Sequence, residues 1–174
     1  YAGEKRQDVL IDACAKSRYA DRIQVILAGK GPLEGKYRRL AKKLPNPIVM
    51  EFYEPERLLE ILHMADLYVH TSDAEIEAMS CMEAFACGLV PVIANSPRSA
   101  TPQFALDSQS LFPAGDSDAL AARIDWWIEH PQERVEMEKR YAEHAKLYAL
   151  DRSIQQTEDM FRQAIAEQKA GSAQ

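Results

Sequence analysis

Residues 67–94 are LYVHTSDAEIEAMSCMEAFACGLVPVIA. The stretch starts with a short apolar run at 67–70, passes through a polar loop at 71–77 and an apolar helical segment at 78–87, and ends with a second apolar run at 90–94. Gly88 stops the helical segment, as glycine commonly does just after the last turn of a helix. A strand, a helix and a strand in this order predict a βαβ unit with parallel strands.

The same alternation continues on both sides of this unit. Apolar runs predict two earlier strands at 23–28 and 48–50 and a short later one at 111–112. Helical spacing predicts further helices, located at 6–18, at 33–44, from Pro55, from the N-cap Asp116, from Pro131 and from the N-cap Asp151. We therefore expect an α/β fold over residues 1–168, a Rossmann-like, mostly parallel sheet with helices on both faces, and a disordered tail at 169–174.

The composition of the chain limits the kinds of partner and the cellular compartment that we expect. The chain has 174 residues, of which 47% are hydrophobic, and a net charge of −6. Proteins that grip nucleic acid usually carry a basic surplus, so nucleic acid is not an expected partner. The three cysteines show no pairs at metal-ligand spacing, and we interpret them as small buried residues in a reducing, cytoplasmic compartment.

Two glutamates, one just before the 78–87 helix and one inside it, are the candidate site. Glu83 lies in an otherwise apolar helical segment, so we expect it to be buried and held by a hydrogen bond or a charge. Glu75 lies eight residues earlier, which is ~12 Å if both are helical. Such a pair brackets a helix N-terminus, whose free N–H groups suit a diphosphate. The alternative is that Glu75 and Glu77 are solvated loop acids and that Glu83 is a satisfied structural carboxylate.

Several segments together resemble the retaining GT-B glycosyltransferases of the large family four. The signature is residues 75–93, where Glu75 and Glu83 precede AFACGLVPVI. Three earlier segments also resemble the family and occur in its order, namely residues 4–13, the turn at 27–32 and the strand entry at 62–69. The resemblance covers about residues 4–165 and implies the C-terminal, donor-binding half of such an enzyme. It implies a nucleotide diphosphate sugar as donor, with a UDP-sugar expected, and neither a cofactor nor a metal.

The resemblance implies a role for three charged side chains. Lys5 contacts the donor diphosphate as a positive charge. Glu75, the candidate catalytic residue, hydrogen-bonds the hexose that is transferred. Glu83 binds the ribose hydroxyls. Transfer of that hexose to an acceptor hydroxyl with retention of configuration is the implied reaction.

The resemblance also implies backbone contacts with the donor. The amides near Ala78 and Met79 meet the phosphates, and the backbone around Tyr53 meets the base. The glycine turn at Gly29 and Gly31 lets the backbone pass close to the donor.

Two departures from the family pattern weaken the implied phosphate site. The family often has Phe-Gly where this chain has Glu77-Ala78, and its arginine partner of Lys5 would fall before Tyr1. We also expect the acceptor domain to lie before Tyr1. Residues 95–106 are similar to glucosyltransferases that act on diacylglycerol, which implies a lipid acceptor and a peripheral membrane location.

Two other functional classes remain open from the residues alone. Gly29 and Gly31 after a strand could start a dinucleotide fingerprint of an oxidoreductase, although position 34, where a third glycine belongs, is Glu34. The other class is a non-catalytic α/β ligand-binding or signalling module. A basic helix with Lys36 and Arg39 could lie on an anionic membrane, but such a helix is more often a solvated face.

Overall fold

The computed structural model describes the backbone of residues 1–171 and the side chains of residues 1–168. All five strands run parallel to their hydrogen-bonded neighbours. The strands are β1 (Ile26–Ala28), β2 (Val49–Glu51), β3 (Leu67–His70), β4 (Val90–Asn95) and β5 (Leu111–Pro113). The helices are α1 (Gln7–Lys16), α2 (Glu34–Leu40), α3 (Pro55–Met64), α4 (Met79–Ala86), α5 (Ser117–Glu129), α6 (Pro131–Ala145) and α7 (Leu150–Gly171). The expected α/β class with a parallel sheet is confirmed.

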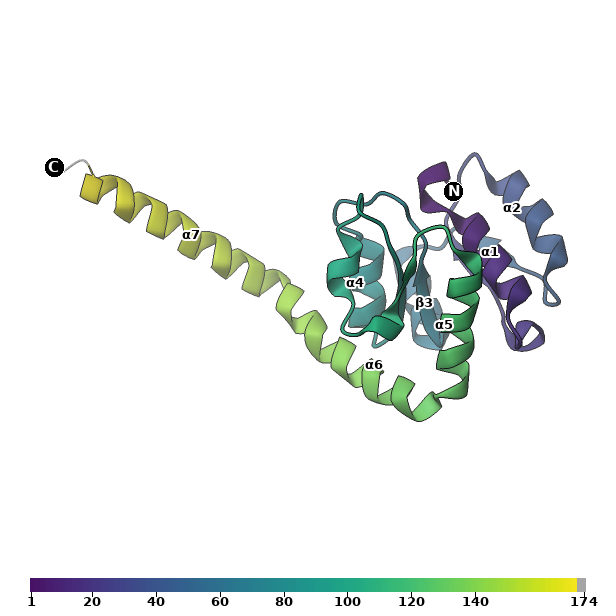
Figure 1. Ribbon diagram of the computed structural model, residues 1–174. Coiled ribbons are helices and arrows are strands. Elements are labelled where there is room, and N and C mark those ends of the chain that lie inside the picture. The colour runs from purple at the N-terminus through teal and green to yellow at the C-terminus, as the bar shows by residue number, and fades with distance from the viewer. Residues whose placement is uncertain (172–174) are drawn as a thin grey trace.

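The strands form two hydrogen-bonded groups. β1 pairs with β2, and β3, β4 and β5 pair in that order. The register places Leu67 opposite Val90 and His70 opposite Ile93. β4 is the central strand of its group, and five of its six residues are buried. In Figure 1, α4 lies on one side of β3 and α5 on the other, so helices cover both faces, as predicted.

Local sequence signals fix several helix ends. Pro55 and Pro131 occupy the first turns of α3 and α6, where their missing N–H costs nothing. The carboxylate of Asp116 accepts hydrogen bonds from the amides of Asp118 and Ala119, so the predicted N-cap of α5 is confirmed. Gly88 adopts φ +86° directly after α4, a left-handed conformation that glycine adopts without a steric penalty.

Other predicted ends are wrong. The first helix starts at Gln7 rather than residue 6, because Arg6 is left-handed with φ 49°. The second helix ends at Leu40 and continues as a 3₁₀ turn. Asp151 is not an N-cap, since α7 already includes Leu150. That helix also runs to Gly171, so 169–171 of the expected tail are helical, and 172–174 lie outside the described residues.

The core lies between β4 and the helices around it. Phe85, Val92, Ile93, Leu120 and Trp127 are almost completely buried there. The neighbouring tryptophan on α5, Trp126, is only half-buried and stacks on His130 at 4.2 Å between ring centroids. One tryptophan of the pair is therefore a core residue, as expected, and the other lies near the surface.

The three cysteines differ in burial. Cys14 and Cys81 are buried, and burial raises the pKa of both thiols to about 12. Cys87 is only half-buried, so the expectation of three buried cysteines is wrong for that residue, which follows the last turn of α4.

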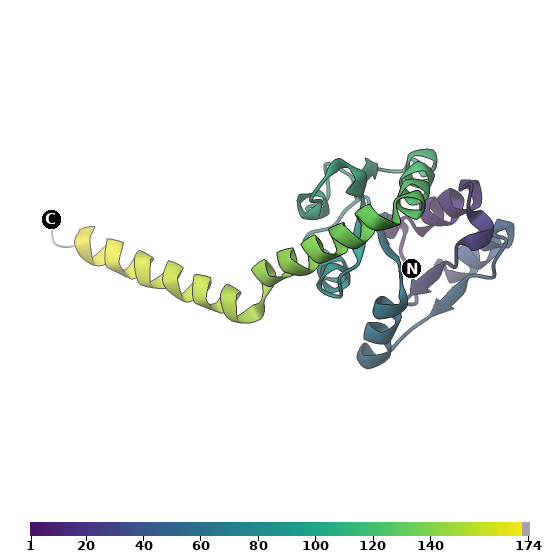
Figure 2. The same ribbon diagram turned by 90° about the horizontal axis from the view of Figure 1, so that it is seen from below.

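The C-terminal helix stands apart from this body. Figures 1 and 2 show α7 projecting away from the sheet and from the other helices. Its apolar side chains Leu150, Ile154, Phe161 and Ile165 are exposed. Their exposure agrees with the expectation that some apolar positions of this helix lack partners, as far as residues 1–168 are concerned. Within residues 1–171, no helix is both long and apolar enough to cross a membrane.

Candidate active site

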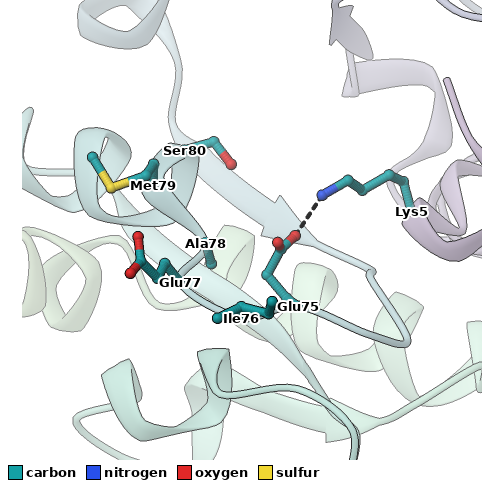
Figure 3. A pocket seen from close by; sticks show the side chains of 7 residues that line it. All are labelled: Lys5, Glu75, Ile76, Glu77, Ala78, Met79 and Ser80. Carbon is teal, nitrogen blue, oxygen red and sulfur yellow. Dashed lines mark hydrogen bonds and ion pairs between the residues drawn. The ribbon is translucent and has the colours of Figure 1, made fainter.

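A surface hollow of about 540 Å³ lies where the loop after β3 meets the first turn of α4. Its volume is within the range of small-molecule sites. We call it the α4 hollow; Figure 3 shows the side chains that line it, which are Lys5, Glu75, Ile76, Glu77, Ala78, Met79 and Ser80. The hollow therefore lies at the carboxyl end of a parallel strand and at a helix N-terminus, where α/β folds bind ligands.

The loop before α4 is held by the segment that carries Lys5. The amide of Asp73 donates to the carbonyl of Glu4 at 2.8 Å, and the Thr71 hydroxyl donates to the carbonyl of Lys5 at 2.7 Å. The Arg6 guanidinium forms an ion pair with the Asp73 carboxylate at 2.9 Å. These contacts bring residues about 70 positions apart in the chain to one place.

A second segment positions Glu75. The Ala100 amide donates to the Glu75 carbonyl at 3.0 Å, and the Glu75 amide donates to the Arg98 carbonyl at 3.4 Å. Glu75 therefore forms an isolated parallel bridge with Ser99. Because Glu75 lies in extended backbone, the helical spacing assumed between Glu75 and Glu83 does not apply.

Opposite charges meet inside the α4 hollow. The Lys5 ammonium nitrogen lies 2.5 Å from Glu75 Oε2, and Figure 3 marks this contact with a dashed line. The Glu75 side chain is mostly covered, whereas that of Lys5 is 42% exposed. The ammonium group is thus accessible to an anion that enters the hollow.

The first turn of α4 offers backbone donors. Ala78, the N-cap, is buried and left-handed with φ 47° and ψ 51°, and no side chain caps the helix. Its carbonyl accepts from the Cys81 amide at 2.8 Å. An anion at this end gains from both the free N–H groups and the helix dipole.

Glu83 is exposed, which contradicts the expected burial. The faces of α4 explain this, since Cys81, Ala84 and Phe85 point into the core and Glu83 points away from it. Among the described residues, no side chain or backbone group forms a hydrogen bond or ion pair with the Glu83 carboxylate. It does not line the α4 hollow, although it lies one helical turn after Met79.

The remaining predicted contacts lie outside the hollow. Gly29, Gly31 and Tyr53 follow the ends of β1 and β2 and are not among the lining residues. A Cβ atom on Gly31 would meet the Tyr1 backbone nitrogen at 2.1 Å, so this glycine is required for packing within the chain. Gly29 has φ +136°, which side chains rarely adopt.

Sequence reasoning missed a buried histidine beside the site. His70 ends β3, is 5% exposed, and places Nε2 3.9 Å from Glu75 Oε2. Burial lowers the pKa of His70 to about 4, with an opposing effect from the Glu75 carboxylate, so the ring is neutral at pH 7. The only sequence signal was a polar residue at the end of an apolar strand.

Comparison with known proteins settles the family. The sequence profile of the glycosyl transferases group 1 matches residues 1–147. The chain belongs to this glycosyltransferase family. It is 49% identical to the solved catalytic domain of cholesterol-α-glucosyltransferase from Helicobacter pylori, with a TM-score of 0.83, over 86% of this chain and 94% of that one. No curated protein sequence matches the chain significantly.

More distant solved structures share the fold of this glycosyltransferase domain. Anabaena HepE, solved in complex with UDP-glucose, is 23% identical with a TM-score of 0.71, over 83% of this chain and 41% of that one. The pneumococcal O-GlcNAc transferase GtfA, solved with UDP and GlcNAc, is 20% identical with a TM-score of 0.78, over 94% of this chain and 34% of that one. The domain thus spans less than half of either of these two chains.

Family membership excludes both alternative classes. A non-catalytic module is excluded because the family is one of transferases. The family match also excludes the dinucleotide-dependent oxidoreductase. The turn supports this exclusion, because the Tyr1 backbone fills the space beside Gly31.

Proposed function

We propose that this glycosyltransferase domain binds a nucleotide diphosphate hexose, with UDP as the nucleotide, and serves its transfer to an acceptor hydroxyl with retention of configuration. The observation that carries the proposal is the Lys5–Glu75 ion pair at the head of α4. Such a donor has an anionic diphosphate next to a hexose rich in hydroxyls. A cation, a carboxylate and free helix amides in one hollow match these groups.

Each charged residue contacts a different part of the donor. Lys5 and the amides near Ala78 and Met79 hold the diphosphate, and Glu75 accepts hydrogen bonds from the hexose. Glu83, exposed one turn further along α4, accepts from the ribose hydroxyls. The backbone around Tyr53 meets the base, and the backbone of the turn at Gly29 passes close to the donor, whereas Gly31 packs against Tyr1.

The transfer needs stabilisation of the leaving diphosphate. The Lys5 ammonium and the N-terminal end of α4 supply positive charge where negative charge develops on the leaving oxygen. The diphosphate then needs neither metal nor cofactor, as the resemblance to the retaining GT-B enzymes implies. Glu75 positions the hexose, and no side chain of this domain is assigned as a nucleophile.

The acceptor is a hydroxyl on a lipid. The similarity to an enzyme that glucosylates a sterol and the likeness of residues 95–106 to the diacylglycerol glucosyltransferases support this class of acceptor. An acceptor domain and a peripheral location at the cytoplasmic membrane surface complete the proposal.

Titration calorimetry of the chain with UDP, GDP and ADP, without added metal, tests the donor. We expect UDP to bind, and Glu83→Ala to weaken it about tenfold, because a hydrogen bond to a charged group contributes about 1.5–3 kcal/mol. Glu136→Ala is the matched control, since Glu136 is an exposed acid on α6. The proposal fails if neither this chain nor a longer one with the acceptor domain binds any of the nucleotides.

A further inference from the structure

A chain of polar contacts runs behind the α4 hollow. Ser80 Oγ lies 2.9 Å from Tyr68 Oη, and Tyr68 Oη lies 3.1 Å from His70 Nδ1. On the other side of the ring, His70 Nε2 lies 3.4 Å from Thr101 Oγ1 and 3.9 Å from Glu75 Oε2. The chain therefore connects the first turn of α4, where Ser80 lies, to the carboxylate of Glu75.

The contacts favour one tautomer of the neutral ring. A neutral imidazole has one N–H donor and one acceptor nitrogen. The negative Glu75 carboxylate is on the Nε2 side, so an N–H there is favoured over a lone pair. The Thr101 hydroxyl oxygen accepts a hydrogen bond from the Ser99 hydroxyl at 2.9 Å. Its second lone pair can accept a hydrogen bond from the N–H group at Nε2 of His70. Nδ1 then accepts from the Tyr68 hydroxyl, which in turn accepts from Ser80.

His70 and Lys5 face the same carboxylate oxygen. The Lys5 ammonium lies 2.5 Å from Glu75 Oε2, and His70 Nε2 approaches that atom from the buried side. Both charged groups that face His70 act on its protonation, Glu75 by raising its pKa and Lys5 by lowering it. If Lys5 turns to a diphosphate, Oε2 loses its cation, and the imidazole N–H is the neighbouring donor that can replace it.

We propose that His70 is a positioning residue that holds Glu75 toward the hexose while Lys5 binds the diphosphate. This inference rests on the proposed function. A small movement of the Glu75 carboxylate toward Nε2 forms the hydrogen bond and leaves the other oxygen for the sugar hydroxyls. A neutral donor suits this task, because it orients the carboxylate and leaves its charge in place for those hydroxyls.

The test compares the affinities of the chain for UDP-glucose and for UDP by calorimetry at pH 7. His70→Met and His70→Gln form a matched pair, since both side chains are similar in length and only glutamine has an N–H near the position of Nε2. We expect His70→Met to raise the ratio of the UDP-glucose Kd to the UDP Kd about tenfold, as loss of a charge-assisted hydrogen bond does. His70→Gln and the control His63→Met, at an exposed position of α3, should leave the ratio within about threefold.

The outcomes separate the inference from the proposed function. If Glu75→Gln raises the ratio and His70→Met does not, His70 has no positioning role and the inference is overturned while the function stands. If neither Glu75→Gln nor any His70 variant changes the ratio, the hexose role of Glu75 fails as well. A loss of equal size in His70→Gln and His70→Met assigns the effect to packing and overturns the inference.

A measurement without nucleotide tests the tautomer directly. Nitrogen-15 NMR of the histidine rings at pH 7 should show His70 protonated at Nε2, and protonation at Nδ1 would overturn the inference whatever the binding data show. If His70→Met does not fold, Tyr68→Phe is the second variant to test. It keeps both aromatic rings and removes only the hydroxyl that donates to His70 Nδ1. This variant removes the hydrogen bond that holds the ring at Nδ1, and we expect it to raise the Kd ratio. An unchanged ratio would show that the Tyr68 contact does not help to position His70 and would contradict this part of the inference.

Discussion

Two residues next to the α4 hollow have costly backbone conformations. Arg6, which follows Lys5, and Ala78, at the head of α4, both have positive φ without being glycine. Such conformations cost about 1 kcal/mol or more each for an L-residue and persist where the surrounding contacts hold them. The Arg6–Asp73 ion pair holds the first of these turns, and burial of the Ala78 methyl group holds the second. Both strained residues therefore lie next to Lys5 or the first turn of α4.

Gly31 and Gly35 allow a matched prediction at the residue scale. Gly31→Ala would place a methyl group against the Tyr1 backbone, which is itself hydrogen-bonded to the carbonyl of Lys30 at 2.6 Å. We expect it to lower the free energy of unfolding by about 1–3 kcal/mol through overpacking. Gly35→Ala meets only the flexible end of Arg39 inside α2 and should raise the free energy by about 0.5–1 kcal/mol.

Chemical denaturation of the two glycine variants measures these changes. A Gly31→Ala variant as stable as the wild type would show that the Tyr1 segment moves aside without cost, and that the turn is free to serve a ligand instead.

At the scale of elements, helix ends decide where side chains are presented. Gly88 ends α4 and lets the chain enter β4 at once, with the Leu89 amide bonded back to the Ala84 carbonyl at 3.1 Å. The return to β4 fixes α4 beside β3, so that its N-terminus faces the loop that carries Glu75. Asp116 sets the start of α5 in the same local manner.

The N-cap of α5 gives the prediction for elements. Asp116→Ala removes the acceptor of two backbone amides, and we expect it to lower the free energy of unfolding by about 1 kcal/mol. Asp118→Ala is the control in the same helical turn, since Asp118 accepts no backbone amide in the cap and pairs only with the exposed Lys16. Thermal and urea denaturation should give a clearly larger loss for Asp116→Ala, and equal losses would show that helix-dipole charge rather than capping stabilises α5.

At the scale of the whole molecule, the body and α7 are joined by an aromatic cluster. Tyr148 lies just before α7 and packs against Phe104 and Phe85, with ring centroids 5.4 and 5.8 Å apart. Phe85 belongs to α4, so the segment just before α7 contacts the helix at whose N-terminus the α4 hollow lies. Beyond this segment, Figures 1 and 2 show no part of the described body beside α7.

Removal of α7 is the prediction for the whole molecule. A chain ending at Ala149 keeps Tyr148 and loses a helix whose apolar side chains are exposed. We expect the free energy of unfolding of the body to change by less than about 0.5 kcal/mol, as for changes at exposed surface. Far-UV circular dichroism should report the loss of helix, and urea denaturation the stability. A loss of more than about 1 kcal/mol would show that α7 packs on the body in solution.

The sequence by itself determined the features that depend on neighbouring residues. The strand at 67–70, the proline starts of α3 and α6, and the cap at Asp116 follow from side-chain chemistry within one or two turns of the chain. The order of strands and helices also fixed the parallel α/β class, because crossovers of this kind leave strands parallel. The motif around Glu75 and Glu83 indicated the family for the same reason, since it is one continuous segment.

Only the tertiary structure decided which side chains meet. Periodicity placed Glu83 in an apolar helix but did not reveal that the core lies on the face with Phe85, so its burial was wrongly predicted. Glu75 meets Lys5 across 70 residues of chain, and His70 meets Thr101 across 31. Such contacts depend on how distant segments pack, and local propensity carries no information about that packing. The motif around Glu75 and the start of α4 is therefore visible in sequence, whereas the contacts of His70 behind Glu75 exist only in the fold.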